Sequence, residues 1–359
     1  MSQNTSTLFS DILEFTKISR WLTPINLEEE RERFLKNSES EPIFIYPKTP
    51  INEIEKYLKL LESVKPKSDE PFGEWIIRRR KKELTLKLRL IGSVGKKDIN
   101  EISKELYDCD FKRTYIESAQ KDSQIEVDFG ECDNATVADI VKAYKKTLSD
   151  YQITDWEVIP TDLSDFYVRI EPKNKRILVG KRVNWDFCDL DCSIAHEIDG
   201  HVVRAVNMHK QKKEIFQKPT PFYINTEEGL ASFLGDYCSK TSQVARKHHA
   251  IKYLGGFLAL KGGFFDIYKY FLGNGFSPDL SFQRTFRLKR GFSDTSKAGV
   301  FAREAMYYSA MMDVKNYLDG GGNVEKLYSG KIGFEDFDHI EVPEDIIIPQ
   351  RLQDYLDNN

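Results

Sequence analysis

The sequence predicts an α+β fold that is mostly helical and holds one small β-sheet. Apolar residues recur at helical spacing through most of residues 7–149 and again after residue 226. Near residues 156–179 the pattern changes to short runs of β-branched and aromatic residues, which favour strands. This change divides the 359 residues into a mainly helical region, 1–150, and a region, 151–359, that holds the sheet and the motifs with chemistry.

The first region is expected to contain five helices. Prolines at 24, 42, 47, 50, 65 and 67 separate the first of them, because proline cannot continue a helix. The fourth helix carries a basic run, Arg78 to Lys82, which is either a face in water or a grip for an acidic partner. Residues 108–134 show no clear pattern. The expected helices cover about 7–21, 27–36, 51–64, 74–91 and 135–149.

The second region begins with three short strands and continues as helices. The last two strands form a hairpin across Glu171 to Lys175. Glycine pairs at 255–256 and 262–263, and the glycines at 320–322, are interpreted as hinges or caps. Residues 323–359 form short elements that end in a strand or packing segment at 346–348. The strands cover 156–159, 166–170 and 176–179, and the helices 227–239, 242–254, 256–271, 278–290 and 300–318.

The hexapeptide from His196 to His201, HEIDGH, is the strongest chemical signal in the chain. Zinc in a hydrolase takes about three protein ligands and leaves one position open, and imidazole is a common ligand. Glu197, beside the first histidine, stands where a base can take a proton from a metal-bound water. The alternative is two unrelated histidines in a buried helix.

The spacing of the two histidines is unusual for one metal site. In an α-helix, residues five apart point about 140° apart around the axis, so both imidazoles would not face one ion. A π-bulge, whose hydrogen bonds run from i to i+5, brings such a pair back to one face. The sequence therefore predicts a π-bulge here, eased by Gly200.

A third ligand is expected from the segment TEEGLA, which begins at Thr226. Thr226 or Asn225 can cap a helix whose first turn carries two glutamates. Glu228 is the preferred ligand and Glu227 the fallback, whereas the plain alternative is that both only balance the helix dipole.

The five cysteines, at 109, 132, 188, 192 and 238, are odd in number and scattered, which argues against a disulfide framework. Cys188 and Cys192 precede His196 at helical spacing and offer a thiolate-rich site as an alternative, although buried packing is favoured.

Composition limits the class of partner. The net charge of −4 gives no basic field for nucleic acid, and no apolar stretch approaches the ~20 residues of a membrane span. The first residues lack the basic and apolar parts of a signal peptide. We therefore expect a cytoplasmic protein without nucleic-acid or membrane partners.

Three blocks of sequence together resemble the tyrosine carboxypeptidase family, whose members include a microtubule-associated enzyme and bacterial relatives with a QEGLA motif. The blocks are IAHEIDGHVVRAVN from Ile194, TEEGLA from Thr226, and RGFSDTS from Arg290 with the spaced residues that follow it to Tyr307. The resemblance runs from about Pro42 to Phe337. Two departures stand out: Asp199 occupies a usual glycine position, and Arg303-Glu304 replaces a Lys-Asp pair.

The resemblance implies a mostly helical, gluzincin-like zinc metallopeptidase that removes a C-terminal residue, tyrosine or phenylalanine, from a peptide or protein. Zinc would be held by His196, His201 and Glu228, with Glu197 as general base. The terminal carboxylate would be bound by guanidinium forks or other donors. The candidates for this binding are Arg290, Arg303 and Lys289, with Thr295 and Ser296 as neutral donors, and Tyr307 as a group that polarises the scissile carbonyl.

Each of these substrate-binding candidates has a structural alternative, namely a charge on a helix surface or an aromatic in the core. Two other functions also remain open. One is a different zinc metallopeptidase, an endopeptidase or aminopeptidase, and the other is a non-catalytic module that binds peptides. The sequence does not indicate the natural substrate protein or the oligomeric state.

Overall fold

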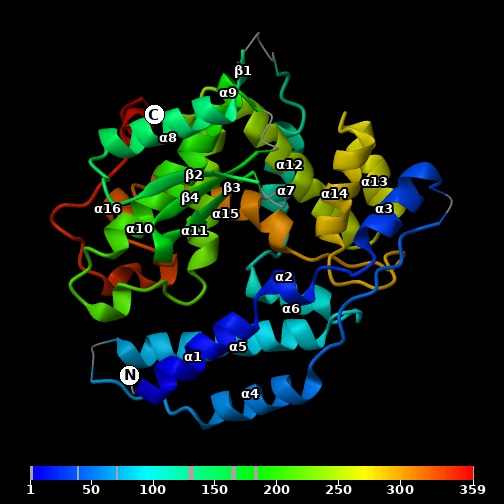
Figure 1. Ribbon diagram of the computed structural model, residues 1–359, viewed down its shortest axis with the longest axis horizontal. Coiled ribbons are helices and arrows are strands. Elements are labelled where there is room, and N and C mark those ends of the chain that lie inside the picture. Colours follow the sequence, from blue (N-terminus) through cyan, green and yellow to red (C-terminus); the bar gives the residue numbers. More distant parts are fainter. Residues whose placement is uncertain are drawn as a thin grey trace. The chain divides into compact units, whose positions relative to one another are not determined.

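The computed structural model describes residues 3–38, 40–69, 72–127, 133–162, 167–181 and 185–358 (Figure 1). The chain forms two compact units that interleave along the sequence. Unit 1 comprises Met1–Gln120 and His249–Ser309, and unit 2 comprises Lys121–His248 and Ala310–Asn359. The regions predicted from sequence, 1–150 and 151–359, are each continuous along the chain, whereas each unit combines two separate segments. A change of composition marks where strands begin, but it does not show which segments pack together.

Unit 1 is helical. The predictions for 27–36, 51–64 and 74–91 are confirmed to within a residue at each end. The predicted helix at 7–21 is interrupted after residue 15, where the Thr16 hydroxyl donates to the Ile12 carbonyl. Its helices are α1 (Gln3–Phe15), α2 (Ile18–Trp21), α3 (Leu27–Lys36), α4 (Ile51–Ser63), α5 (Gly73–Gly92), α6 (Ile99–Leu106), most of α7 (Arg113–Asp122), most of α12 (Ser242–Ala259), α13 (Phe264–Gly273) and α14 (Pro278–Leu288).

An aromatic cluster forms the core that joins the two sequence segments of unit 1. The ring of Phe34 on α3 lies 4.9 Å from Tyr268 and 5.2 Å from Phe264, both on α13. Phe44 meets Phe286 of α14 at 5.2 Å. Aromatic rings packed edge to face contribute beyond the area they bury, so this cluster stabilises the pairing of distant segments.

The basic run Arg78 to Lys82 lies on α5 and is engaged within unit 1. Arg80 forms an ion pair with the buried carboxylate of Glu83, and Lys82 lies 3.1 Å from Glu105. The side chains of Arg78 and Lys82 remain 64% and 61% exposed, so these two charges lie on a face in water beside the carboxylates of Glu74 and Glu105.

The glycine pair at 255–256 is not a hinge, which corrects the sequence-based expectation. Helix α12 (Ser242–Ala259) runs through it without a break. A Cβ at Gly255 would lie 2.9 Å from Phe271, and one at Gly256 would lie 2.9 Å from the Ala305 methyl. These glycines allow close packing inside a helix, whereas Gly262-Gly263 does separate α12 from α13 as predicted.

Unit 2 contains the predicted sheet. Its strands are β2 (Glu157–Thr161), β3 (Val168–Glu171) and β4 (Arg176–Gly180), in the order β2-β4-β3. Strand β2 is parallel to β4, and β3 is antiparallel to β4 across the predicted hairpin, which contains the short 3-10 turn η1 (Pro172–Asn174). The predicted start of the second strand, residue 166, lies outside the described residues. A further pair, β1 (Asn134–Ala135) and β5 (Trp185–Asp186), was not predicted.

Helices surround this sheet. Helix α8 (Val137–Asp150) begins at a capping box made by Thr136 and Asp139, and it packs along β2 (Figure 1). Residues 346–348 form no strand, and Ile347 instead bonds with Asn207. The remaining helices of this unit are α9 (Phe187–Ser193), η2 (Ile194–Val202), α10 (Val203–Met208), η3 (Glu214–Phe216), α11 (Tyr223–Cys238), most of α15 (Arg303–Asp319), α16 (Val324–Tyr328), η4 (Phe334–His339) and α17 (Gln350–Asp357).

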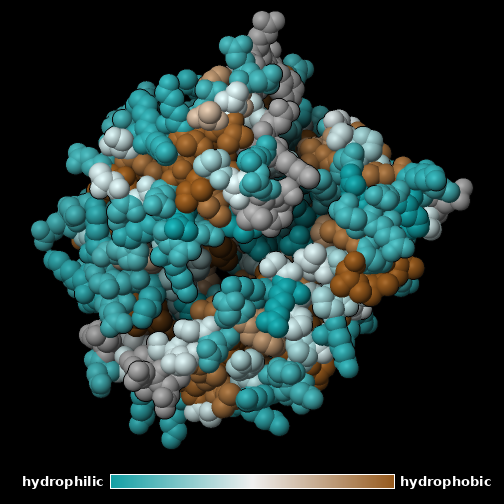
Figure 2. Space-filling model, in the orientation of Figure 1, coloured by the Kyte–Doolittle hydropathy of each residue, from teal (hydrophilic) through white to brown (hydrophobic). Residues whose placement is uncertain are grey.

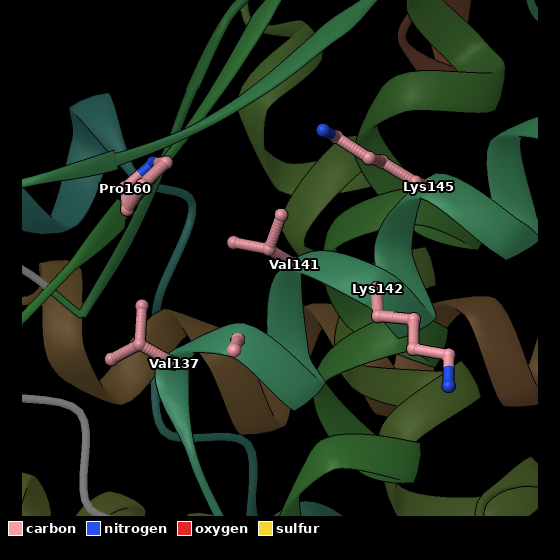
Figure 3. A pocket seen from close by; sticks show the side chains of 6 residues that line it. Val137, Val141, Lys142, Lys145 and Pro160 are labelled. Carbon is pink, nitrogen blue, oxygen red and sulfur yellow. The ribbon is translucent and has the colours of Figure 1, made fainter.

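An open, mainly apolar groove of about 520 Å³ lies between α8 and β2 (Figure 3). Figure 2 shows hydrophobic surface in the same area. The groove is lined by Val137, Ala138, Val141, Lys142, Lys145 and Pro160.

Among the described helices, none combines the length and the apolar character that crossing a bilayer requires.

Candidate metal centre

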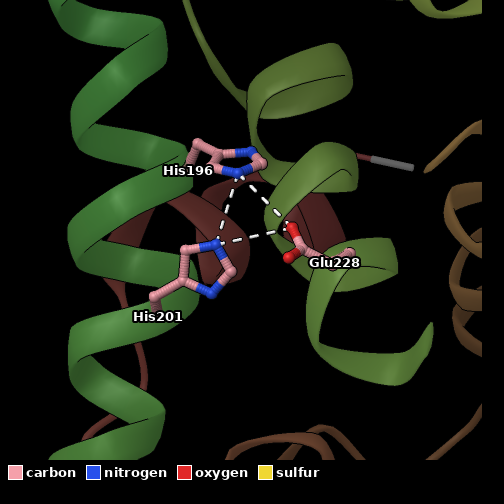
Figure 4. Close-up of side chains that lie close together, drawn as sticks. All are labelled: His196, His201 and Glu228. Carbon is pink, nitrogen blue, oxygen red and sulfur yellow. Dashed lines mark hydrogen bonds and ion pairs between the residues drawn. The ribbon is translucent and has the colours of Figure 1, made fainter. Parts of the chain in front are cut away.

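The three predicted metal ligands converge in unit 2 (Figure 4). The Nε2 atoms of His196 and His201 lie 3.3 Å apart. Oε2 of Glu228 lies 3.8 Å from the first of these nitrogens and 3.6 Å from the second. Zinc at about 2.0–2.1 Å from tetrahedral ligands spaces them about 3.3–3.4 Å apart, so the donor set fits this ion. Within the described residues, no other group of His, Cys, Asp and Glu side chains could hold a metal.

The two histidines share a face because their helix has changed type. Residues Ile194–Val202 form the π-helix η2, between the α-helices α9 and α10. Hydrogen bonds from i to i+5 place residues five apart above one another, which brings His196 and His201 together. The predicted π-bulge is confirmed, and it extends over nine residues.

Gly200 allows η2 and α11 to approach closely. A Cβ at this position would lie 2.7 Å from the Cβ of Ala231 and 2.8 Å from its Cα. Any side chain would therefore push apart the helix that carries the histidines and the helix that carries Glu228. Gly200 is needed for this contact between helices, a reason that differs from the easing of the bulge expected from sequence.

Glu227 is not grouped with the three ligand atoms but contacts one of the ligands, His201, at the other nitrogen of its ring. Its Oε1 lies 3.0 Å from Nδ1 of His201, and its Oε2 accepts from Arg204 at 3.1 Å. The Lys331 ammonium also contacts Oε1. Burial by itself would raise the pKa of Glu227, but Lys331, His201 and Arg204 hold this pKa far below its usual range. A carboxylate that accepts from Nδ1–H leaves the Nε2 lone pair of His201 for a metal.

The start of α11 corrects one expectation. The helix begins at Tyr223, so both glutamates lie beyond its first turn and do not simply balance its dipole. Neither Thr226 nor Asn225 is the N-cap, because both lie inside the helix and the N-cap is Phe222. The Thr226 hydroxyl instead accepts from the backbone N–H of Phe334 at 3.0 Å. Glu228, the preferred ligand, is the glutamate that faces the histidines.

Glu197 lies partly buried on the same π-helix. Burial and the nearby Glu228 raise its pKa to about 7, although His201 acts in the opposite direction. A carboxyl group with a pKa near neutrality can both accept and return a proton, as a general base requires.

A strap at residues 328–333, not anticipated from sequence, lies against α10 and reaches Glu227 of α11. Asn207 donates to the Tyr328 carbonyl at 2.9 Å, and Arg204 donates to the Ile332 carbonyl at 2.8 Å. Gly330, at φ 133°, leaves no room for a side chain, since a Cβ would lie 2.9 Å from Cα of Met208. The only sequence signal was a pair of polar residues, Arg204 and Asn207, in an otherwise apolar stretch.

Cys192 is not part of the centre. Its thiol is largely buried, and burial raises its pKa to about 12, so it stays protonated. Its Sγ packs near Gly235, where a Cβ would lie 3.2 Å away. The side chain of Cys188 lies outside the described residues, as does Cys132, and Cys192 fits the packing interpretation.

Two substrate-binding candidates in unit 1 have structural tasks. Lys289 is fully buried, and its ammonium donates to the carbonyls of Gly262 (2.7 Å), Lys297 (2.7 Å) and Gly299 (3.0 Å). All three donors are used, which leaves none for a substrate carboxylate and corrects that expectation. Thr295 is also fully buried and donates to the Pro42 carbonyl at 2.6 Å.

The other candidates of unit 1 are less constrained. Ser296 donates its hydroxyl to Asp294 at 2.6 Å, within a turn. Arg290 lies over the ring of Phe286 at 5.2 Å, and its buried Nε has no hydrogen-bond partner among the described residues. Burial lowers the pKa of Arg290, with Glu304 acting against it.

The last two candidates, Arg303 and Tyr307, lie near the start of α15, also in unit 1. Burial raises the pKa of the Tyr107 hydroxyl, and Arg303 lies close enough to oppose this rise. Tyr307 stacks on His249, with ring centroids 6.0 Å apart. His249 was not predicted as a site residue, because no motif surrounds it in the sequence.

Comparison with known proteins gives consistent matches. A family model described as microtubule-associated tyrosine carboxypeptidase matches residues 32–346. The human protein named "Putative tyrosine carboxypeptidase MATCAP2" is 28% identical over 177 residues, which cover 46% of this chain and 33% of the relative. Human "Microtubule-associated tyrosine carboxypeptidase 1" is 26% identical over 191 residues, 49% of this chain and 38% of the relative. The matches thus span little more than a third of these relatives.

Proposed function

This chain belongs to the microtubule-associated tyrosine carboxypeptidase family, and from that membership we propose that it is a zinc-dependent carboxypeptidase. Its substrate is the C-terminus of a peptide or protein that ends in tyrosine or phenylalanine. One observation carries the proposal: ligand atoms of His196, His201 and Glu228 all lie within 4.8 Å of one another, next to Glu197, a partly buried glutamate with a raised pKa.

In this proposal the chain's own residues divide the work. A bound zinc supplies a Lewis acid that polarises the scissile carbonyl and acidifies water. Glu197 takes the proton of the attacking water and delivers it to the leaving amine. Glu227 keeps His201 in the tautomer that binds through Nε2.

The sheet offers a surface along which an extended peptide can be held. Strand β3 is an edge of the sheet in the described strand order, and it contacts the π-helix η2. Zinc proteases use such an edge strand to bind substrate by backbone pairing. We propose that β3 has this role here.

Recognition of the terminal carboxylate is proposed for Arg290 and Arg303. A guanidinium fork binds both oxygens of a carboxylate, and the buried Nε of Arg290 has no partner within the described part of the chain. Tyr307 is proposed as the donor to the scissile carbonyl. The structure supports Arg290 more than Ser296, whose hydroxyl is engaged by Asp294.

The names of the family and of one relative refer to microtubules, but the partner proposed for this chain is defined by chemistry: a peptide or protein with a free C-terminal aromatic residue. We propose that it acts in the cytoplasm, without nucleic acid or membrane. The alternatives are an endopeptidase or aminopeptidase with the same centre, and a non-catalytic peptide-binding module.

A paired measurement of metal content and amino-acid release tests the proposal. Purified protein should contain about one zinc per chain, and His196→Ala and His201→Ala should each lose it. Tyrosine should be released from a peptide with a free C-terminus and not from the same peptide amidated at that end. Cleavage of the amidated peptide would favour an endopeptidase or aminopeptidase, and zinc content that is unchanged in both variants would remove the site assignment.

A further inference from the structure

Helix α17 carries Arg351, whose guanidinium contacts the helices that supply the candidate metal ligands. Nε of Arg351 lies 3.1 Å from Oδ2 of Asp199. Its two terminal nitrogens bind the two oxygens of Asp191 at 3.2 and 3.1 Å, and one of them also donates to the Cys238 carbonyl at 3.0 Å. The guanidinium fork is thus used on three partners, which come from three different helices.

Those three helices are the ones that build the centre. Asp199 lies in η2, two residues before His201. Asp191 lies in α9, which leads directly into η2, and Cys238 is the last residue of α11, which carries Glu228. One side chain therefore ties together both elements that supply ligands and the helix that leads into them.

Asp199 is held from both sides. It is 1% exposed, and its other oxygen, Oδ1, accepts from the Tyr151 hydroxyl at 2.8 Å. A buried carboxylate is tolerated when it is paired and hydrogen-bonded, and loss of one partner is costly. Arg351 supplies the charge that makes an aspartate acceptable inside the π-helix.

The docking of α17 does not depend on Arg351 alone. Leu352 is fully buried, and the ring of Tyr355 lies 5.1 Å from Phe233 of α11. Before the helix, Asn207 and Ile347 exchange two hydrogen bonds, of 2.8 and 3.0 Å. Replacement of Arg351 should therefore leave α17 in place and remove its hold on Asp199.

We propose that Arg351 is a positioning residue, which fixes the π-helical turn around Asp199 and so keeps His196 and His201 on one face. A π-helix is rare, and a return to α-helical bonding would swing the two imidazoles apart by about 140°. The inference rests on the proposed zinc site for its functional meaning. The family match ends at residue 346, so Arg351 and α17 lie outside the matched region, whereas the partners of Arg351 lie inside it.

The test measures zinc affinity and local order in two variants. In Arg351→Met, zinc affinity should fall about tenfold to a hundredfold, as when other supporting partners of metal ligands are lost. In the metal-free protein, backbone amides of residues 194–202 should exchange hydrogen faster than in the wild type. Arg351→Lys keeps the charge without the guanidinium fork, so its zinc affinity and its amide exchange should lie between those of the wild type and those of Arg351→Met.

Rescue separates positioning from simple damage. Asp199→Asn removes the charge that Arg351 neutralises and keeps an acceptor for Tyr151. The double variant Asp199→Asn/Arg351→Met should therefore regain most of the zinc affinity and most of the exchange protection that Arg351→Met loses.

A matched control lowers stability elsewhere in unit 2. Ile177 is fully buried in β4 and takes part in none of the side-chain hydrogen bonds of Arg351 and Asp199, so Ile177→Ala should lower the urea midpoint without a selective effect on residues 194–202. The proposal is overturned if Arg351→Met matches the wild type in both measurements, if its losses do not exceed those of Ile177→Ala, or if the double variant recovers nothing. A wild type that binds no zinc would refute the proposed function, and exchange in the metal-free protein would still decide the role of Arg351.

Discussion

Glu227 and Glu228 are neighbours in sequence and face different partners. The carboxylate of Glu228 faces the two imidazoles, whereas that of Glu227 is enclosed by His201, Arg204 and Lys331. Consecutive residues of a helix point about 100° apart, so one can reach the centre and the other its surroundings. The pair combines a ligand with the group that orients another ligand.

Substitution of each glutamate should therefore give a different defect. Glu228→Ala should lose stoichiometric zinc and keep the fold. Glu227→Ala should still bind zinc, about tenfold to a hundredfold more weakly, because His201 loses its acceptor. It should also unfold more easily, by about 3–5 kcal/mol, because Arg204 and Lys331 are left buried without their counter-charge. Zinc titration and urea unfolding measure these effects, and the opposite pattern would assign the ligand to Glu227.

Glu197 can be tested without loss of the metal. Glu197→Gln is nearly isosteric and leaves the three ligands in place, so zinc content and stability should be retained. Loss of a general base typically costs about 10²–10⁴-fold, and kcat on a peptide ending in tyrosine should fall at least about a hundredfold. Zinc content and tyrosine release are measured on the same sample. A fully active variant, or one that is inactive only because it lacks zinc, would exclude Glu197 as the base.

At the scale of elements, η2 and α11 can approach closely only because Gly200 has no side chain. Gly200→Ala would place a Cβ within 2.8 Å of both Cα and Cβ of Ala231, so the helices must separate. Overpacking of this kind costs about 1–3 kcal/mol, and zinc affinity should fall with it, because Glu228 moves away from the histidines.

The control for this substitution is Gly273→Ala, at the end of α13, where a Cβ meets nothing within 4 Å. It should be neutral or stabilise by up to about 1 kcal/mol, since alanine restricts the unfolded chain. Urea unfolding and zinc titration compare the two. Equal behaviour of both variants would show that the approach of η2 to α11 does not limit the site.

Much of the element pattern could be predicted from local signals. The helix at Leu27–Lys36 is bounded by its own apolar spacing, and the five-residue histidine spacing indicated the π-helix. Helices α6 and α7 were not predicted, because they are short and take part of their stability from packing. The hinge predicted at Gly255 and Gly256 was wrong for a related reason. Glycine is required there because a neighbouring ring and a methyl group, distant in sequence, leave no room for a side chain.

Site residues could be predicted where their role follows from residues close to them in sequence. They could not be predicted where their role depends on residues that are distant in sequence. The ligands follow from residue types and spacing. Lys331 and Arg351 come from segments more than 100 residues away from the residues they support, and no local pattern marks them. Lys289 was misjudged because its three carbonyl partners belong to two loops that only the folded chain brings around it.

At the scale of the whole molecule, each unit depends on its own buried charges. In unit 1, Glu304 lies 3.2 Å from Arg287 and 3.7 Å from Arg284. Burial would raise the pKa of Glu304, but Arg287, Lys252, Arg284 and Arg290 outweigh it and lower the pKa from 4.5 to about 2. A depressed carboxyl pKa contributes stability above the unfolded-state pKa, and this stability is lost as pH falls toward the folded-state value.

Unit 1 should therefore be acid-labile through Glu304. Glu304→Gln should lower the free energy of unfolding at pH 7 by about 1–3 kcal/mol. The difference from the wild type should stay constant down to about pH 4.5 and shrink between pH 4.5 and 2, because the unfolded chain then binds a proton that the folded chain takes up only near pH 2. Urea unfolding at several pH values provides the measurement. A difference that does not change over this window would show that Glu304 does not carry the effect.

The interleaving of the two units sets an order of events while the protein is being made. Phe34 and Phe44 leave the ribosome long before Phe264, Phe282 and Phe286, the rings they pack against. At about 5–20 residues per second, synthesis of the intervening residues takes about 10–45 s. Throughout that time the nascent N-terminal segment exposes aromatic side chains that only later residues can cover, so it is a natural client for a chaperone at the ribosome exit.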